Sequence, residues 1–175
     1  GGSQGAAAIN QAIVSMLPMV KKLAVPVRIV HQAGEHDCEM VSRAYAACGV
    51  EAEVTPFITD MVSAYAAADL VICRAGATSL AEITVAGKAS ILVPFPLAAD
   101  DHQTLNARAM VEAGAAVMIR QSELCAETLF AIVQNLLGDE HRIREMERQA
   151  KMLGRPDAAA RIVDICLEMI GRKKQ

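Results

Sequence analysis

Short β-prone segments alternate with helical stretches along this chain of 175 residues, and the alternation limits the folds that it can adopt. The segment DLVIC at 69–73 is almost continuously apolar, and the stretches between such segments carry apolar residues at helical spacing. Strands that are joined through helices form parallel sheets covered on both faces, with right-handed crossovers. The pattern therefore predicts a Rossmann-like doubly wound α/β domain.

The bounds of the expected elements follow from apolar spacing and from the positions of glycine and proline. We expect strands at 27–31, 51–55, 69–73, 89–93 and 115–119, and helices at 6–23, 37–48, 59–68, 79–86, 102–112, 122–137, 139–153 and 157–170. Thr59 and Ser122 are the expected N-caps of two of these helices.

Composition excludes several classes of protein. The chain is 53% hydrophobic but only 3% aromatic, so its core must be aliphatic. A net charge of -3 and the scarcity of aromatic residues argue against a nucleic-acid-binding domain. The five cysteines form no CxxC pair, which favours small buried side chains in a reducing compartment. No apolar run approaches the ~18 residues of a membrane-spanning helix.

The chain opens on a glycine-rich segment, Gly1-Gly2-Ser3-Gln4-Gly5. A glycine turn of this kind usually follows a strand. We therefore expect residues 1–175 to be a fragment with at least one strand, and a partner domain, upstream.

Ligands of doubly wound sheets bind outside the carboxyl ends of the strands. Three segments of this chain are expected there, namely 1–6, 74–82 and 94–106. In the first, glycines let backbone amides approach a ligand, and the Ser3 hydroxyl can donate to a phosphate oxygen. A tight turn without a ligand is the alternative, because the segment is neither GxGxxG nor a P-loop.

The second segment follows the predicted strand 69–73 directly, and its small and hydroxyl-bearing residues lie at the start of the next predicted helix. Two such helix starts in one domain could hold a pyrophosphate together. Glu82 has two interpretations. Ser79 and Glu82 have the spacing of a capping box, in which Glu82 would occupy position N3. Alternatively, the Glu82 carboxylate accepts hydrogen bonds from the two hydroxyls of a ribose.

The third segment runs from Pro94 to Asn106 and concentrates polar groups at its end. His102 and Gln103 are candidates for hydrogen bonds to sugar hydroxyls. Alternatively, His102 simply begins the helix, with Asp100 or Asp101 as its cap. His31, at the end of another strand, is expected to be structural rather than catalytic.

Motifs in all three segments resemble the C-terminal domain of the MurG family of bacterial peptidoglycan glycosyltransferases. The matching pieces are GGSQGA with Asn10 behind it, HQAG, FITDM, CRAGATSLAEI and PFPLAADDHQTLNA, and RPDAAARI fits the helical tail. They run in family order from Gly1 to about Ala116. The resemblance implies one half of a two-domain GT-B enzyme that transfers N-acetylglucosamine (GlcNAc) from UDP-GlcNAc, with inversion. The acceptor would be the C4 hydroxyl of undecaprenyl-pyrophosphoryl-MurNAc-pentapeptide.

The resemblance also implies roles for particular residues. Ser3 and the Gly76–Ser79 loop would hold the diphosphate, Ile58 the uracil, Glu82 the ribose, and His102 and Gln103 the GlcNAc. The implied substrate-binding residues are Ser3, Gln4, Ile58, Gly76, Ala77, Thr78, Ser79, Glu82, His102 and Gln103.

The family's acceptor site and proposed general base lie in its N-terminal domain, so no catalytic residue is assigned to this chain. We expect no cofactor and no metal, because helix N-termini can stabilise the diphosphate and no carboxylate pair suited to Mg²⁺ is evident. The implied location is cytoplasmic, peripheral on the inner face of the membrane. Two alternatives stay open: the donor half of another UDP-sugar lipid glycosyltransferase, and a non-catalytic nucleotide-binding domain.

Overall fold

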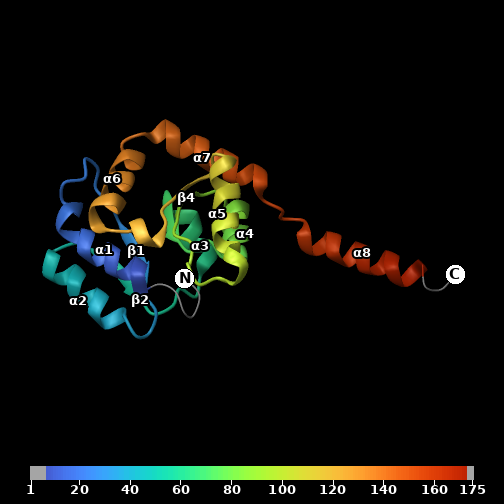
Figure 1. The fold of residues 1–175 in the computed structure, drawn as a ribbon, viewed down its shortest axis with the longest axis horizontal. Coiled ribbons are helices and arrows are strands. Elements are labelled where there is room, and N and C mark those ends of the chain that lie inside the picture. Colours follow the sequence, from blue (N-terminus) through green and yellow to red (C-terminus); the bar gives the residue numbers. More distant parts are fainter. Residues whose placement is uncertain (1–6, 173–175) are drawn as a thin grey trace.

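The computed structural model describes residues 7–172, and Figure 1 shows strands and helices alternating along them. The strands are β1 (Ile29–Gln32), β2 (Ala52–Thr55), β3 (Leu70–Cys73), β4 (Ala89–Leu92) and β5 (Ala116–Met118). The helices are α1 (Ala7–Val20), α2 (Cys38–Cys48), α3 (Met61–Ala67), α4 (Ala77–Ala86), α5 (His102–Glu112), α6 (Ala126–Leu137), α7 (Glu140–Leu153) and α8 (Ala158–Arg172). Two short 3-10 helices, η1 (Ala99–Asp101) and η2 (Gln121–Glu123), precede α5 and α6.

All strand pairs are parallel, as predicted. β1 pairs with β2, and β4 lies between β3 and β5. Within residues 7–172 no backbone pairing joins these two groups, so the described strands form a two-stranded and a three-stranded sheet rather than one continuous sheet. All four residues of β4 are buried, as expected for a central strand covered on both faces.

Helices cover both faces of β4, which defines the doubly wound architecture. Ile91 belongs to a core cluster with Leu17 of α1 and Leu129 of α6. Leu92, the next residue, belongs to a second cluster that includes Ile83 of α4. Successive strand residues point to opposite faces, so each cluster takes alternate side chains of β4. In Figure 1, α1, α2 and α6 accordingly lie on one side and α4 and α5 on the other, with α7 across both.

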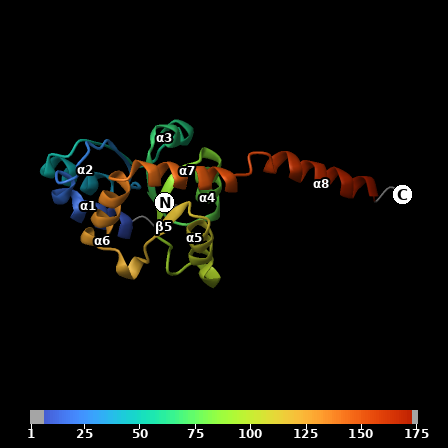
Figure 2. The same ribbon diagram turned by 90° about the horizontal axis from the view of Figure 1, so that it is seen from above.

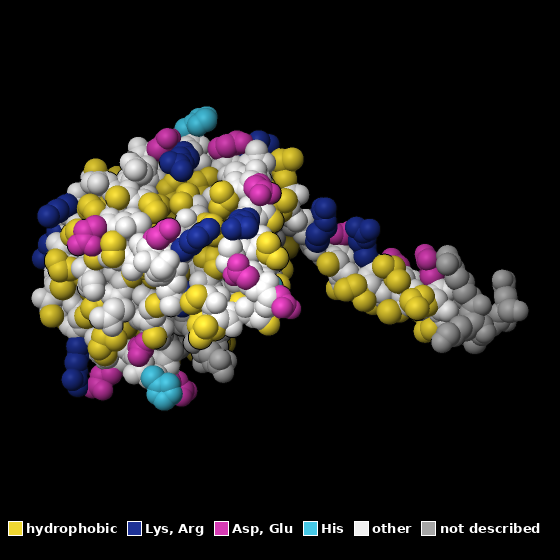
Figure 3. Space-filling model, in the orientation of Figure 1, with side chains coloured by type: hydrophobic (Ala, Val, Ile, Leu, Met, Phe, Trp, Pro, Cys, Tyr) yellow, Lys and Arg dark blue, Asp and Glu magenta, His cyan; other side chains and the backbone are white. Residues whose placement is uncertain are grey.

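Helix α8 extends away from the rest of the molecule in both views (Figures 1 and 2). Every residue from Ala158 to Ile170 is exposed. Its apolar side chains recur at helical spacing, with Ile162, Ile165 and Met169 between 55% and 62% exposed, and Figure 3 shows hydrophobic side chains gathered along one side of this helix.

Several predicted details are wrong. Asp60, not Thr59, caps α3 through its carboxylate, which accepts from the Ser63 amide at 3.0 Å. Helix α6 begins at Ala126 with Cys125, not Ser122, as its N-cap. Ser122 lies in η2 instead.

The cysteine prediction also fails in part. Cys125 and Cys166 are exposed, whereas the other three cysteines are partly buried, and all five are free. Among the described helices, none combines the length and the hydropathy needed to cross a membrane.

Candidate functional site

The loops that follow β3 and β4 emerge side by side at the carboxyl edge of the three-stranded sheet. Cys73 lies opposite Leu92 in the register, and the Val93 amide donates to the Cys73 carbonyl at 2.8 Å. The side-chain amide of Asn106 in α5 donates to the Ala75 carbonyl oxygen at 3.1 Å. The structure thereby brings together two of the three predicted segments, 74–82 and 94–106.

Helix α4 begins two residues earlier than predicted. Gly76 is its N-cap, with an extended backbone and no side-chain hydrogen bond to the first turn. Amides of a helix start without a side-chain cap are available to an anion, and the helix dipole favours negative charge there. Thr78 and Glu82 are both exposed. Because they are four residues apart, they lie on one face of α4, about 6 Å apart along its axis.

The capping-box interpretation of Glu82 is wrong. With Gly76 as the N-cap, position N3 is Ser79, so Glu82 lies too far along α4 to bond the N-cap amide. Its carboxylate oxygen Oε2 instead accepts a hydrogen bond from the hydroxyl of Tyr65 at 3.1 Å. The prediction that Glu82 binds ribose hydroxyls therefore no longer competes with a capping role.

Arg74 is only 5% exposed and joins three elements of the carboxyl edge. Its guanidinium donates to the carbonyl oxygens of Val93 and Pro94, both at 3.1 Å, and to Oε1 of Gln121 in η2 at 2.6 Å. It also lies over the ring of Phe95, 5.4 Å from the centroid. Burial lowers the pKa of Arg74. These contacts make Arg74 a support of the loop after β4, a role that the sequence left unassigned.

Gln103 binds the same loop from α5, since its Oε1 accepts from the Phe95 amide at 3.0 Å. The Gln103 Nε2 group remains a donor for a ligand. His102 is exposed and begins α5, as one of the two interpretations predicted. Its Nδ1 lies 2.7 Å from the Ala99 carbonyl oxygen, which can only accept, so Nδ1 carries the proton in this arrangement.

The prediction that Asp100 or Asp101 caps the helix is confirmed for the N-cap position and wrong for the side-chain hydrogen bond. Asp100 and Asp101 both have left-handed backbones, with φ of 48° and 52°. Asp101 occupies the N-cap position, but its carboxylate accepts from the Thr104 hydroxyl rather than from an α5 amide.

Ile58 follows β2 and is partly buried. Its backbone amide donates to Oε1 of Gln32, at the end of β1, with a distance of 3.0 Å. Sequence reasoning assigned no role to Gln32, although its place in HQAG at a strand end was a signal. A base that bonds the Ile58 amide must therefore displace the Gln32 side chain.

His31 is structural, as predicted. It is 6% exposed, its Nε2 lies 2.9 Å from Oδ1 of Asn10, and its Nδ1 lies 3.1 Å from the Tyr45 hydroxyl. Asn10 in turn donates to the Ala33 carbonyl at 2.8 Å and to the Asp37 carboxylate at 2.7 Å. A neutral imidazole with its proton on Nε2 satisfies both contacts. Burial lowers the pKa of His31 below its usual 6.5.

This burial predicts a pH dependence of stability. In the unfolded chain His31 takes up a proton near pH 6.5, whereas the folded ring stays neutral to lower pH. The stabilisation is thus complete above pH 6.5 and is lost as the pH falls below it, by at most about 1.4 kcal/mol per pH unit. Urea unfolding at pH 7.5, 6.5 and 5.5 measures it. The slope should persist in His36→Gln, an exposed control, and flatten in His31→Gln; an equal slope in both would contradict the assignment.

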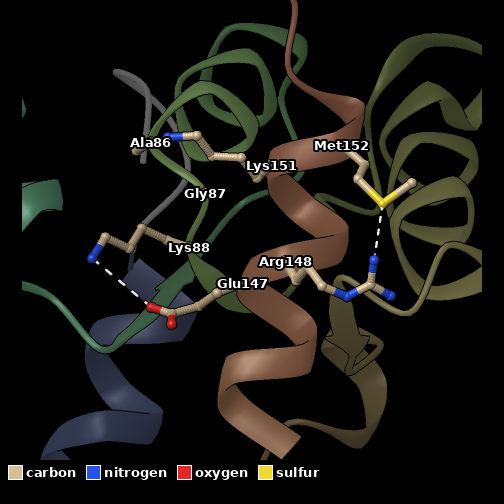
Figure 4. Close-up of a pocket in the computed structure, with 7 residues that line it drawn as sticks. All are labelled: Ala86, Gly87, Lys88, Glu147, Arg148, Lys151 and Met152. Carbon is tan, nitrogen blue, oxygen red and sulfur yellow. Dashed lines mark hydrogen bonds and ion pairs between the residues drawn. The ribbon is translucent and has the colours of Figure 1, made fainter.

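Two of the hollows in the described part of the chain are lined by none of the predicted site residues. One, of about 500 Å³, lies between the end of α4 and α7 and is drawn in Figure 4, where Lys88 pairs with Glu147. The other, of about 570 Å³, lies between α1 and the start of α6 and includes Gln121. Residues 7–172 hold no cluster of three or more His, Cys, Asp or Glu suited to a metal ion.

Most predicted site residues converge on the three-stranded sheet. Gly76, Ala77, Thr78, Ser79 and Glu82 lie on α4 or at its start, and His102 and Gln103 begin α5. Ile58 follows β2, in the two-stranded group. Ser3 and Gln4 lie outside the described residues, so their predicted roles stay predictions.

Comparison with known proteins agrees with this arrangement. The family model for the glycosyltransferase family 28 C-terminal domain matches residues 1–162. The UDP-N-acetylglucosamine--N-acetylmuramyl-(pentapeptide) pyrophosphoryl-undecaprenol N-acetylglucosamine transferase of Myxococcus xanthus is 52% identical over 97% of this chain and 44% of that protein. The Syntrophus aciditrophicus protein of the same name is 54% identical over 97% of this chain and 47% of that protein.

Solved structures agree as well. The crystal structure of Acinetobacter baumannii MurG matches with a TM-score of 0.85 and 39% identity, over 96% of this chain and 48% of that one. The glycotransferase of kitacinnamycin, at 20% identity and a TM-score of 0.63, shares the fold. This chain spans about half the length of these relatives. The family resemblance and the fold class predicted from the motifs are therefore confirmed, and the chain belongs to the family of glycosyltransferase family 28 C-terminal domains.

Proposed function

We propose that this chain is the donor-binding half of a GT-B enzyme that transfers GlcNAc from UDP-GlcNAc to lipid-linked MurNAc-pentapeptide. The names of its relatives support the reaction. The observation that carries the proposal is the pairing of β3 with β4, which sets the uncapped start of α4 beside the start of α5. A diphosphate and its attached sugar need binding groups at two such neighbouring positions.

The parts of the donor are assigned to residues that follow β2, β3 and β4 and to Ser3 and Gln4. The diphosphate binds at the α4 N-terminus with Ser3 and Gln4, and the ribose lies one helical turn further on, at Glu82. The GlcNAc reaches His102 and Gln103. The uracil binds at the backbone of Ile58, after Gln32 has released the amide.

The chemistry of the start of α4 suits this reaction. The C4 hydroxyl of the acceptor sugar attacks the anomeric carbon, the bond to the β-phosphate oxygen breaks, and UDP leaves. Negative charge grows on the β-phosphate in the transition state. Backbone amides at the start of α4 are already oriented, so they stabilise that charge without reorganisation, and the Thr78 hydroxyl is a further donor there. No metal is needed for this step.

The acceptor and the general base belong to the other half of the enzyme. We infer a preceding domain that binds the lipid-linked acceptor and operates at the cytoplasmic face of the membrane. The 175-residue chain alone is accordingly expected to bind the donor and to have no transferase activity. Turnover of the lipid acceptor by this chain alone would contradict the proposal that the active site is divided between two domains.

Isothermal titration of the chain with UDP, UDP-GlcNAc and NAD tests the proposal. We expect UDP and UDP-GlcNAc to bind and NAD not to bind, because the site provides groups for a uridine diphosphate and lacks the GxGxxG fingerprint with its ribose-binding acid. Repeating the UDP titration in EDTA should leave the affinity unchanged. Failure to bind UDP would overturn the proposed function, and loss of binding in EDTA would overturn its metal independence.

A further inference from the structure

The hydrogen bond between Tyr65 and Glu82 links α3 to α4, the two helices on either side of β3 in the chain. Tyr65 lies on α3, Glu82 lies on α4, and the hydroxyl oxygen is 3.1 Å from Oε2. Glu82 is exposed. An exposed glutamate that is fixed by a neighbouring side chain has fewer rotamers than a free one.

The Tyr65 ring is held independently of this bond. It packs against the core cluster built around Ile83 and Leu92. Helix α3 is held at its start by the Asp60 cap and near its end by Lys88, whose Nζ lies 3.4 Å from the Ala66 carbonyl oxygen. The hydroxyl is therefore presented to Glu82 from an anchored ring.

The Tyr65 hydroxyl is suited to donate a hydrogen bond to the Glu82 carboxylate. Burial, followed by the charge of Glu82, raises the pKa of Tyr65 well above its usual 10, so the hydroxyl keeps its proton at neutral pH. A carboxylate has about four lone-pair positions, and Tyr65 uses one of them on Oε2. The remaining positions, including both on Oε1, are sufficient for the two hydroxyls of a ribose.

We propose that Tyr65 is a positioning residue that holds the Glu82 carboxylate in the orientation that receives the ribose hydroxyls, and that the Tyr65–Glu82 pair selects ribonucleotide over deoxyribonucleotide donors. The inference rests on the proposed function, because it requires a nucleoside diphosphate at α4. Tyr65 touches no reacting atom. It acts by reducing the side-chain ordering that binding would otherwise require of Glu82.

The test compares the affinities of UDP and 2′-deoxy-UDP for the 175-residue chain by isothermal titration. The wild-type chain should prefer UDP by about 10-fold or more, since a hydrogen bond to a charged group is lost with the hydroxyl. Tyr65→Phe removes one oxygen and keeps the packed ring. It should lower the affinity for UDP by about 3- to 10-fold and that for 2′-deoxy-UDP by less, so the preference shrinks.

Two variants control the measurement. Tyr45→Phe removes the hydroxyl of the other tyrosine, which bonds His31 in the core around α1 and α2, and should leave the preference for UDP unchanged. The double variant Tyr65→Phe/Glu82→Gln should bind UDP no more weakly than Glu82→Gln alone, because the two residues act through one contact. Thermal unfolding of each variant verifies that it is folded.

The outcomes distinguish a failure of this inference from a failure of the proposed function on which it rests. A chain that binds UDP and loses its preference in Glu82→Gln, but keeps it in Tyr65→Phe, would overturn the role of Tyr65 and leave the proposed function standing. Additive losses in the double variant would also overturn it. A wild-type chain that does not bind UDP would overturn the proposed function and this inference with it.

Discussion

Glu82→Gln is expected to lower the affinity of the chain for UDP by about 10- to 100-fold. The expected loss is large because, in the proposed site, the carboxylate accepts both ribose hydroxyls as charge-assisted bonds, whereas an amide provides one acceptor oxygen and carries no charge. Titration of UDP into both chains measures the ratio of the dissociation constants. In an active full-length enzyme the same change should raise KM for the donor more than it lowers kcat, because the ribose lies away from the reacting carbon.

Thermal stability distinguishes a specific loss of UDP affinity in Glu82→Gln from a general loss of folded structure. Glu82 is exposed and does not cap α4, so Glu82→Gln should leave the unfolding midpoint nearly unchanged. Glu112→Gln, at the exposed end of α5, is the matched control and should alter neither UDP affinity nor stability. Unchanged UDP affinity in Glu82→Gln would remove Glu82 from the site.

Arg74→Met is expected to lower the free energy of unfolding by about 3 kcal/mol. The substitution removes the donors to the carbonyl oxygens of Val93 and Pro94 and to Gln121. Buried acceptors without a donor keep their desolvation cost, and a broken buried network is among the few changes with effects of this size. The unfolding midpoint of a domain of this length should fall by about 6–12 °C, which differential scanning calorimetry measures.

Two further arginine variants test whether the lost hydrogen bonds of Arg74 cause this destabilisation. Arg74→Lys keeps the charge but loses the planar fork, so it should recover only part of the stability. Arg28→Met removes an exposed arginine whose partner, Glu53, lies 3.5 Å away at the surface, and should change stability by no more than about 0.5 kcal/mol. Equal midpoints in Arg74→Met and wild type would show that the loop after β4 is held by other contacts.

The strands and helices were predictable because their signals are local. The signal for β3 is the apolar run DLVIC at 69–73, which involves only five neighbouring residues, and the strand is found at Leu70–Cys73. A glycine after a helical stretch also predicts a helix end locally, and Gly49 and Gly87 both lie at helix C-termini with left-handed backbones.

The start of α4 shows where local signals mislead. Ser79 and Glu82 have the right spacing for a capping box, yet the helix begins earlier, after Gly76. A spacing of three identifies two residues on one helical turn, but it does not say which turn is the first. That is decided by the point where β3 ends and the chain can turn back over the sheet.

By itself, the sequence determined the parallel α/β class, the order of the motifs and the family, since each depends on residues that are close together in the chain. Only the tertiary structure decided which side chains meet. Tyr65 and Glu82 are 17 residues apart, and Arg74 and Gln121 are 47 apart. Such contacts depend on strand pairing and on the packing of helices across both faces of β4. No local pattern encodes the direction in which a side chain meets a distant one, so the roles of Arg74, Tyr65 and Gln32 emerged only from the folded chain.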